Sequence, residues 1–418
     1  MIPKQYPYVK EARNLKGVSA SIEREVDPAD FTRFDPVPRE GIERAIAVMQ
    51  SGKLFRYSDS RPEDSEVALL ERDFAEYLGV RHALGLSSCS KAIELALIVC
   101  GVEPGSKVLV PGFTFTSVPS AIVILRAIPV FVECTEHYRM DIDDLRRKIT
   151  SETKVLLLSH MRGHTSDMDA VTQLCAEHGI ALVEDAAHAL GGRWRGKRVG
   201  SYGKAGCFSF QSNKIINAGE GGMLTTDDDE IIVKAIYLSG AYESNHQKHF
   251  TRSPLFEEFA GTLPLHNARM TNVTAAIARS QLNLLEEKGE RYRQMYAYIR
   301  RELTATNHIE FPQEHPYETR IPDSIQFRVS GFDASQMRAF AERVRERGLP
   351  LARFAERDNA RAFYNWRYLD GHMPDLPQTR RVIENACDLR LPSMLGEAHL
   401  AYLVAVVRSA IHEVAATG

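Results

Sequence analysis

Short apolar runs alternate with segments of helical periodicity through the middle of this chain. The runs are rich in β-branched residues and lie at 107–110, 129–132, 154–158, 180–183 and 207–210. Parallel strands need a crossover of a dozen or more residues, usually a helix, and burial on both faces makes them nearly continuous in hydrophobicity. The alternation therefore predicts an α/β fold with a mainly parallel sheet wrapped by helices.

The chain of 418 residues is too long for one compact core, so about two domains are expected. Residues 1–60 contain several prolines and predict an irregular N-terminal arm with a short helix. Residues 61–304 hold the alternating section and form the predicted large domain. Residues 305–418 follow a different pattern and predict a smaller C-terminal α/β domain.

Other elements are predicted from apolar spacing and end signals. Residues 65–78 have helical spacing and stop at a glycine, and residues 271–304 predict one or two long helices. The predicted small domain holds a strand at 325–329, an amphipathic helix at 334–347 and a terminal helix at 398–415.

The charges of the chain nearly balance, because 52 basic and 55 acidic residues leave a formal charge of -3. This gives no global electrostatic reason to bind nucleic acid or an anionic membrane, and it favours small-molecule partners. The N-terminal residues lack the apolar region of a secretion signal, and the most hydrophobic later stretch, 118–132, is interrupted by Pro119, Arg126 and Pro129. No membrane span is expected.

Six cysteines are scattered along the chain without CxxC spacing. They are typical of reduced thiols in a cytoplasmic protein, and their spacing argues against a structural zinc site.

Lys214 and Asp185 have the arrangement that pyridoxal phosphate requires. Asp185 ends an apolar strand, and Lys214 follows on a short loop just before a glycine turn at 219–222. The carboxylate would keep the pyridine nitrogen protonated, and the lysine would bind the aldehyde. A solvated surface lysine is the alternative for Lys214 taken alone.

Ser88, Cys89 and Ser90 directly precede an apolar helix and predict a phosphate-binding turn, since a helix N-terminus attracts anions. An ordinary serine N-cap is the alternative. Ser209 lies five residues before Lys214 and offers a second hydroxyl to the same pocket. Phe115, in the turn after a predicted strand, is expected to stack on the pyridine ring, with core packing as the rival role.

Two further motifs are open to more than one interpretation. His160, Arg162 and His164 lie in a loop after a strand, where they would line a substrate site or form ordinary hydrogen bonds; no metal site is expected there. Arg162 suits a substrate carboxylate or phosphate as well as it suits solvent. The basic run 193–198 is interpreted as a charged exposed hairpin rather than a phosphate-binding patch.

Several motifs together resemble the DegT/DnrJ/EryC1/StrS family of sugar aminotransferases. They are Phe-Thr-Phe at 113–115, Glu-Asp-Ala-Ala-His at 184–188, the glycine- and aromatic-rich run at 200–210, Lys214, Gly-Glu-Gly-Gly at 219–222 and Asn-Ala-Arg-Met at 267–270. The resemblance implies a type I aminotransferase fold and a homodimer with shared active sites. It also implies amino transfer from glutamate or glutamine to a keto sugar or cyclic keto-polyol, through pyridoxamine phosphate.

The resemblance also implies individual roles. Lys214 resembles the Schiff-base lysine, Asp185 the pyridinium partner, Ser209 a phosphate ligand and Phe115 the stacking aromatic. Asn267 resembles a residue lent to the phosphate by the second subunit. Arg269, in the same motif, is a candidate substrate residue together with His160 and Arg162.

The chain departs from the family pattern at three places. His188 stands where many members have glutamine, and a neutral imidazole can donate the same hydrogen bond to the cofactor. Cys89 replaces a usual glycine, and residues 160–164 replace a more apolar pattern, which leaves the substrate open. Two alternatives remain: a pyridoxamine-dependent dehydratase, which the resemblance implies would carry histidine in place of Lys214, and a non-catalytic cofactor-binding regulator.

Overall fold

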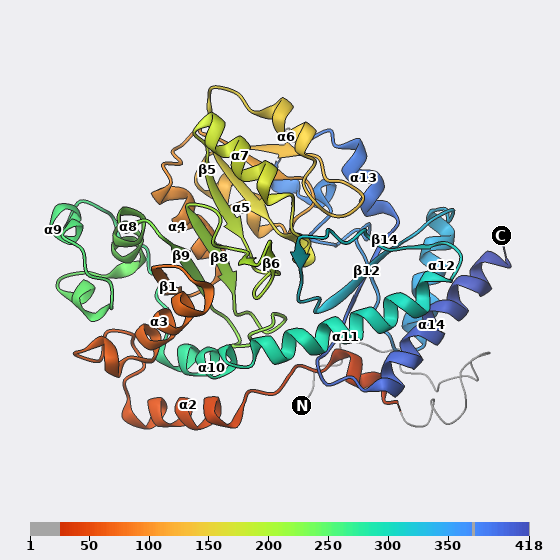
Figure 1. Cartoon of the computed structure of the whole chain (residues 1–418), viewed down its shortest axis with the longest axis horizontal. Coiled ribbons are helices and arrows are strands. Elements are labelled where there is room, and N and C mark those ends of the chain that lie inside the picture. The colour runs from red at the N-terminus through yellow and green to blue at the C-terminus, as the bar shows by residue number, and fades with distance from the viewer. Residues whose placement is uncertain (1–25, 370–372, 418) are drawn as a thin grey trace.

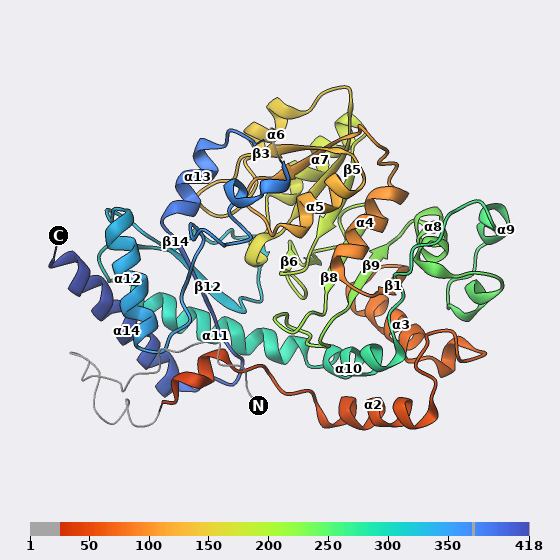
Figure 2. The same ribbon diagram turned by 180° about the vertical axis from the view of Figure 1, so that it is seen from behind.

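The computed structural model describes residues 26–369 and 373–417 of the chain. The first part of the predicted arm, residues 1–25, lies outside the described residues. Its remainder forms a short 3-10 helix, Pro28–Thr32, and the helix α2, Arg39–Ser51, which is longer than predicted. Helix α2 lies alongside α10 (Figures 1 and 2), and Gly41 permits this close approach, since an added Cβ would lie 2.3 Å from Ser280 Oγ.

A seven-stranded sheet forms the centre of the molecule, in the order β1-β9-β8-β5-β4-β2-β3. The strands are β1 (His82–Leu86), β2 (Lys107–Pro111), β3 (Ile128–Val132), β4 (Thr153–Ser159), β5 (Ala181–Asp185), β8 (Ala205–Ser209) and β9 (Gly222–Thr226). The five predicted strands are confirmed as β2, β3, β4, β5 and β8, and they pair in parallel. Strands β1 and β9 were not predicted and add an antiparallel edge.

Helices cover both faces of this sheet (Figure 1). Helices α4 (Cys89–Val99), α5 (Ser117–Ile124) and α8 (Asp229–Gly240) pack on one face, and α6 (Ile142–Lys148) and α7 (Met168–His178) on the other. Strand β4 shows the consequence: Val155 and Leu157 join the first cluster, whereas Leu156 and Leu158 join the second. Burial on both faces explains the unbroken apolar runs in the sequence.

The ends of the helices follow local signals. Helix α3, Glu66–Leu78, begins after Ser65, whose side chain accepts a bond from the N–H of Ala68, and it ends at Gly79 in the left-handed region. The prediction for 65–78 is confirmed. Residues 241–265, which lacked a predicted element, contain a 3-10 turn, Asn245–Lys248, and a short helix α9, Leu255–Phe259.

A second, antiparallel sheet follows the long helices α10 (Asn272–Leu282) and α11 (Leu285–Thr304). Its strands are β10 (Ile309–Glu310), β12 (Ser324–Val329), β13 (Ala352–Arg353) and β14 (Ala386–Arg390), and α12 (Ala334–Glu346) and α14 (Glu397–Ala415) share its apolar cluster. Helix α13 (Pro377–Glu384) joins the cluster of the large sheet and bonds to Glu133 beyond β3. The predicted elements at 271–304, 325–329, 334–347 and 398–415 are confirmed.

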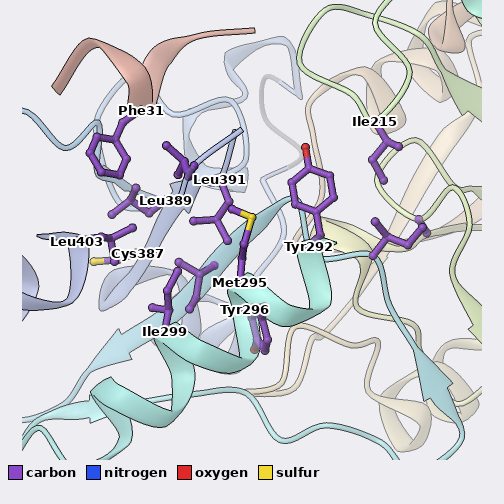
Figure 3. Close-up of a cluster of buried hydrophobic side chains, with 14 of the residues drawn as sticks. Phe31, Ile215, Tyr292, Met295, Tyr296, Ile299, Cys387, Leu389, Leu391 and Leu403 are labelled. Carbon is purple, nitrogen blue, oxygen red and sulfur yellow. The ribbon is translucent and has the colours of Figure 1, made fainter. Parts of the chain in front are cut away.

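Helix α11 joins the two halves of the molecule. Tyr292, Met295 and Ile299 project from it into a cluster with Leu389 and Leu403 of the small sheet and terminal helix (Figure 3). The same cluster extends to side chains beside the large sheet. The apolar side of α11 therefore packs in a core that includes residues of both sheets.

The basic run 193–198 forms the hairpin of β6 (Arg193–Trp194) and β7 (Lys197–Arg198), with β11 (Glu318–Thr319) as a third strand. The prediction of a hairpin is confirmed, but full exposure is wrong for Trp194, which is buried and stacks on His315 at 4.4 Å. Its arginines form ion pairs with acidic side chains, which leaves little free charge for phosphate groups.

Candidate active site

Three neighbouring strands bring polar side chains to one edge of the large sheet. Ser159 ends β4, Asp185 ends β5 and Ser209 ends β8, and these strands run in parallel beside one another. Ser159 and Asp185 are partners in the strand register. Ligands of open α/β sheets bind at this carboxyl edge, so its side chains define the candidate active site.

Asp185 is held firmly in place. Ser159 Oγ donates a hydrogen bond of 2.7 Å to one carboxylate oxygen, and the N–H of Ala187 donates one of 3.1 Å to the other. Cys89 Sγ lies 3.8 Å from the second oxygen. The side chain is almost fully buried, so its orientation is set by the protein rather than by water.

Lys214 faces the same region from the loop after β8. Its Nζ lies 2.9 Å from Nε2 of His188. Burial, together with the charge of Arg162, lowers the pKa of Lys214 to about 8. Burial and the charge of Lys214 also hold the pKa of His188 well below its usual range, so this imidazole is neutral. The amine therefore has an accessible neutral, nucleophilic form.

The helix α4 provides an anion-binding end close to these groups. Ser88 is its N-cap and accepts a bond of 3.2 Å from the N–H of Lys91, while Ser90 in the first turn is exposed. The first N–H groups of a helix have no partners within it and attract anions. Gly222 packs tightly behind this turn, since an added Cβ would lie 2.3 Å from the carbonyl carbon of Ser88.

Phe113 and Phe115 have different surroundings. Phe113 is 1% exposed and packs against Phe354, with ring centroids 4.9 Å apart. Phe115 is 38% exposed, and the guanidinium of Arg361 lies 5.4 Å from the centroid of its ring. Phe113 is thus a core residue, and Phe115 is the aromatic side chain free to contact a ligand.

His160 lies in a buried network rather than beside Lys214. Its Nε2 is 3.1 Å from a carboxylate oxygen of Glu184, and both side chains are fully buried. Glu184 also accepts bonds from the N–H groups of Gly200 and Gly203, at 2.9 and 2.8 Å. The network ties strand β5 to the segment before β8, which is a structural role.

His164 is also buried. Its ring nitrogens contact the side chains of Gln326 and Arg320, at 3.1 Å and 2.8 Å for Nε2. Within residues 26–369 and 373–417, no three His, Cys, Asp or Glu side chains are arranged to hold a metal ion. In the same ranges, no helix has the length and apolar character that crossing a bilayer demands.

Arg162 belongs to the site, whereas the contacts of Arg269 are with Gly240 and with the rings of Phe55 and Tyr242. Arg162 has a left-handed backbone (φ 53°), forms an ion pair with Asp388, and has an Nε without a partner. Its charge acts on Lys214. Arg269 donates a bond of 3.0 Å to the carbonyl of Gly240, and Asn267 is exposed nearby.

Sequence reasoning missed Ser159 and Arg361. Ser159 lies one residue beyond the predicted strand 154–158, so a more exact strand end would have placed it beside Asp185. Arg361 lies in an irregular segment more than 200 residues from Phe115, and no local pattern signals their contact.

A family model, described as the DegT/DnrJ/EryC1/StrS aminotransferase family, matches residues 39–408. The chain belongs to this family. The protein is accordingly an aminotransferase, and both the resemblance of the motifs and the expected enzyme class are confirmed.

Known proteins similar to this aminotransferase include two curated relatives. It is 33% identical to 3-amino-5-hydroxybenzoate synthase of Amycolatopsis mediterranei over 328 residues, which cover 77% of this chain and 79% of the relative. It is 36% identical to GDP-perosamine synthase of Caulobacter vibrioides over 218 residues, which cover 52% and 56%.

The crystal structure of 3-amino-5-hydroxybenzoic acid synthase has the same fold as the aminotransferase. The TM-score is 0.80 at 27% identity, and the match covers 91% of this chain and 99% of that one. The predicted fold class, that of type I aminotransferases, is confirmed.

Proposed function

We propose that this aminotransferase uses pyridoxal phosphate to move an amino group from glutamate or glutamine to a keto sugar or a cyclic ketone. One relative is named for GDP-perosamine and another for 3-amino-5-hydroxybenzoate. These names support an acceptor that is either nucleotide-linked or cyclic. The observation that carries the proposal is the contact of 2.9 Å between Lys214 Nζ and His188, beside a fixed Asp185.

The residues present fit this cofactor. Asp185 is a buried carboxylate without a cationic partner within 4.0 Å among the described residues, which suits a protonated ring nitrogen. Gly222 packs closely against the backbone of Ser88 and so fixes the α4 turn, whose Ser90 is exposed and whose first N–H groups suit a phosphate. Ser88, Cys89, Ser90 and Ser209 would hold that phosphate, and the exposed ring of Phe115 would stack on the pyridine.

When bound, pyridoxal phosphate supplies an aldehyde that condenses with amines and a ring that accepts electrons. The protein supplies the proton transfers and the orientation. Lys214 Nζ, which is neutral above about pH 8, takes a proton from the substrate carbon and returns it. His188 holds this amine in position and donates a hydrogen bond toward the cofactor, and Asp185 stabilises positive charge at the far end of the ring.

We also propose a cytoplasmic homodimer with active sites at the interface. Asn267 is exposed, in keeping with a role across that interface, and Ile42, Ile46 and Met49 on α2 expose 44 to 54% of their surface. All six cysteines are free, as suits a reducing compartment. The division into domains at residues 61–304 and 305–418 remains part of this proposal.

Replacing the lysine tests the function. In the cofactor-loaded enzyme, Lys214→Ala should lower amino transfer by at least about 10³-fold, because both the nucleophile and the general base are lost. Transfer is measured with glutamate and glutamine as donors, and with keto sugars and inososes as acceptors. Lys204→Ala is the matched control, since Lys204 is exposed and pairs with Asp228, and it should leave the rate unchanged.

Two results would contradict the proposal. Undiminished turnover by Lys214→Ala would remove the lysine from the chemistry. Loss of a hydroxyl from a keto sugar without any need for Lys214 would favour the dehydratase alternative instead.

A further inference from the structure

The segment between β13 and the 3-10 turn Phe363–Asn365 runs from the small sheet to Phe115 and Thr116, beside the candidate active site. The carbonyl of Ala360 accepts bonds from the N–H of Thr116, at 3.0 Å, and from Trp366 Nε1, at 2.9 Å. The N–H of Arg361 donates to Asn359 Oδ1 at 3.0 Å. The backbone next to Arg361 is thus fixed against the residue that follows Phe115.

The guanidinium of Arg361 forms no ion pair with any residue that the structure describes. It lies 5.4 Å from the centroid of the Phe115 ring, and its Nε is shielded from solvent without any hydrogen-bond acceptor. No carboxylate of a described residue lies within 4.0 Å of it. Arg361 is half-buried, and a shielded donor without a partner, such as its Nε, is costly to keep unless a ligand satisfies it.

The charged neighbours of Arg361 do not neutralise it. Burial and the charge of Arg162 lower the pKa of Arg361 to about 10, and the carboxylates of Asp388 and Asp323 oppose this only in part. Asp388 is already engaged by Arg162 and by Gln326 Nε2, the latter at 2.8 Å. Lys214 also carries a positive charge below about pH 8.

We propose that Arg361 binds a carboxylate of the substrate, held above the exposed face of Phe115 and beside Lys214. The inference rests on the proposed function and adds a requirement that one substrate carries a carboxylate near the reacting carbon. The planar fork of arginine matches a carboxylate with two parallel hydrogen bonds. Arg162, which is already paired with Asp388, contributes charge rather than a second free fork.

The carboxylate has two possible sources, the amino-acid donor and a carboxylated cyclic acceptor. Because both substrates occupy the same site in turn, one arginine can serve either. Separate measurements of the two half-reactions distinguish them: L-glutamate is compared with 4-aminobutyrate, and 3-oxocyclohexane-1-carboxylate with 3-(hydroxymethyl)cyclohexanone.

The first test is binding, which needs no turnover. Calorimetry on the cofactor-loaded protein compares benzoate with benzyl alcohol. Wild type should prefer benzoate, and Arg361→Gln should raise the Kd for benzoate about 10- to 100-fold while changing that for benzyl alcohol less than about twofold. Arg361→Lys should lose less affinity for benzoate than Arg361→Gln, because it keeps the positive charge. Arg357→Gln, an exposed arginine in the same segment, is the matched control and should bind like wild type.

The kinetic arms then assign the source. A 10- to 100-fold rise in KM for L-glutamate alone assigns Arg361 to the donor, and the same rise for the carboxylated ketone alone assigns it to the acceptor. Equal preference of wild type for benzoate and benzyl alcohol overturns the proposal, as does an equal loss of both ligands in Arg361→Gln. If wild type transfers no amino group but its benzoate binding depends on Arg361, the proposed function fails and the carboxylate site stands.

Discussion

The two sides of the active site differ in how completely their polar groups are paired. On the strand side, Asp185 receives hydrogen bonds from Ser159 and Ala187, and Glu184 is surrounded by donors. On the loop side, within residues 26–369 and 373–417, Arg361 Nε has no hydrogen-bond partner and the Lys214 amine contacts the neutral imidazole of His188. Regular strands position the groups expected to hold a constant cofactor, whereas the less regular segments leave donors open for a variable substrate.

The strongest test of the strand side is removal of the negative charge of Asp185. Asp185→Asn should lower kcat by about 10²- to 10³-fold, because an amide does not stabilise a protonated ring nitrogen. Ser159→Ala should lower kcat only about tenfold, since it removes one hydrogen bond to a carboxylate that keeps another. Both rates are measured at saturating donor and cofactor. An Asp185→Asn enzyme within tenfold of wild type would show that the strand side does not control the chemistry.

The loop side is tested by pH. Since burial lowers the pKa of Lys214 from 10.5 to about 8, capture of pyridoxal phosphate by the unloaded protein should slow about tenfold per pH unit below 8. Borohydride trapping followed by mass spectrometry measures the rate. Arg162→Gln should move the midpoint upward, because it removes a charge that disfavours the ammonium form. A wild-type midpoint near 10 would contradict the assigned environment.

The same shift has a consequence for stability. The unfolded chain holds the lysine proton up to about pH 10.5, whereas the folded protein releases it near 8, so the buried ammonium destabilises the unloaded fold most below pH 8. Lys214→Met should therefore raise the Tm of the unloaded protein at pH 7. The gain should shrink between pH 8 and 10.5.

The smallest effect on kcat is expected for replacement of Cys89. Cys89 Sγ is 3.8 Å from Asp185, and a thiol is a weak donor, so Cys89→Ala should keep kcat within about threefold of wild type. Steady-state assays with the preferred donor check this. A loss of thirtyfold or more would make the thiol part of the orienting set around Asp185.

The sequence predicted those features that depend on local signals. The central strands were visible because they are buried on both faces, and α3 was visible because Ser65 and Gly79 mark its ends. Strands β1 and β9 were missed although they are as long as β2 and β5, and they differ from those strands in pairing antiparallel. Their existence depends on long-range pairing rather than on their own composition.

In the site, too, the residues at or just after strand ends could be predicted from the sequence, and those placed by contacts between distant segments could not. Lys214 and Asp185 follow strand ends, so topology brings them together. For His160 the sequence left a substrate-lining role and an ordinary hydrogen bond both open, because its contact with Glu184 depends on which way the chain turns after β4. Arg361 reaches the site through packing between distant segments, which no periodicity reveals.

The N–H of Thr116, in the loop after β2, donates a hydrogen bond to the carbonyl of Ala360, in the segment after β13. This bond joins two parts of the chain that are distant in sequence. Residues 354–369 are held beside Phe115 by this backbone contact and by the Tyr368 hydroxyl, which donates to the carbonyl of Thr116 at 3.1 Å. The side chain of Arg361 can therefore be replaced while the segment keeps its place next to Phe115.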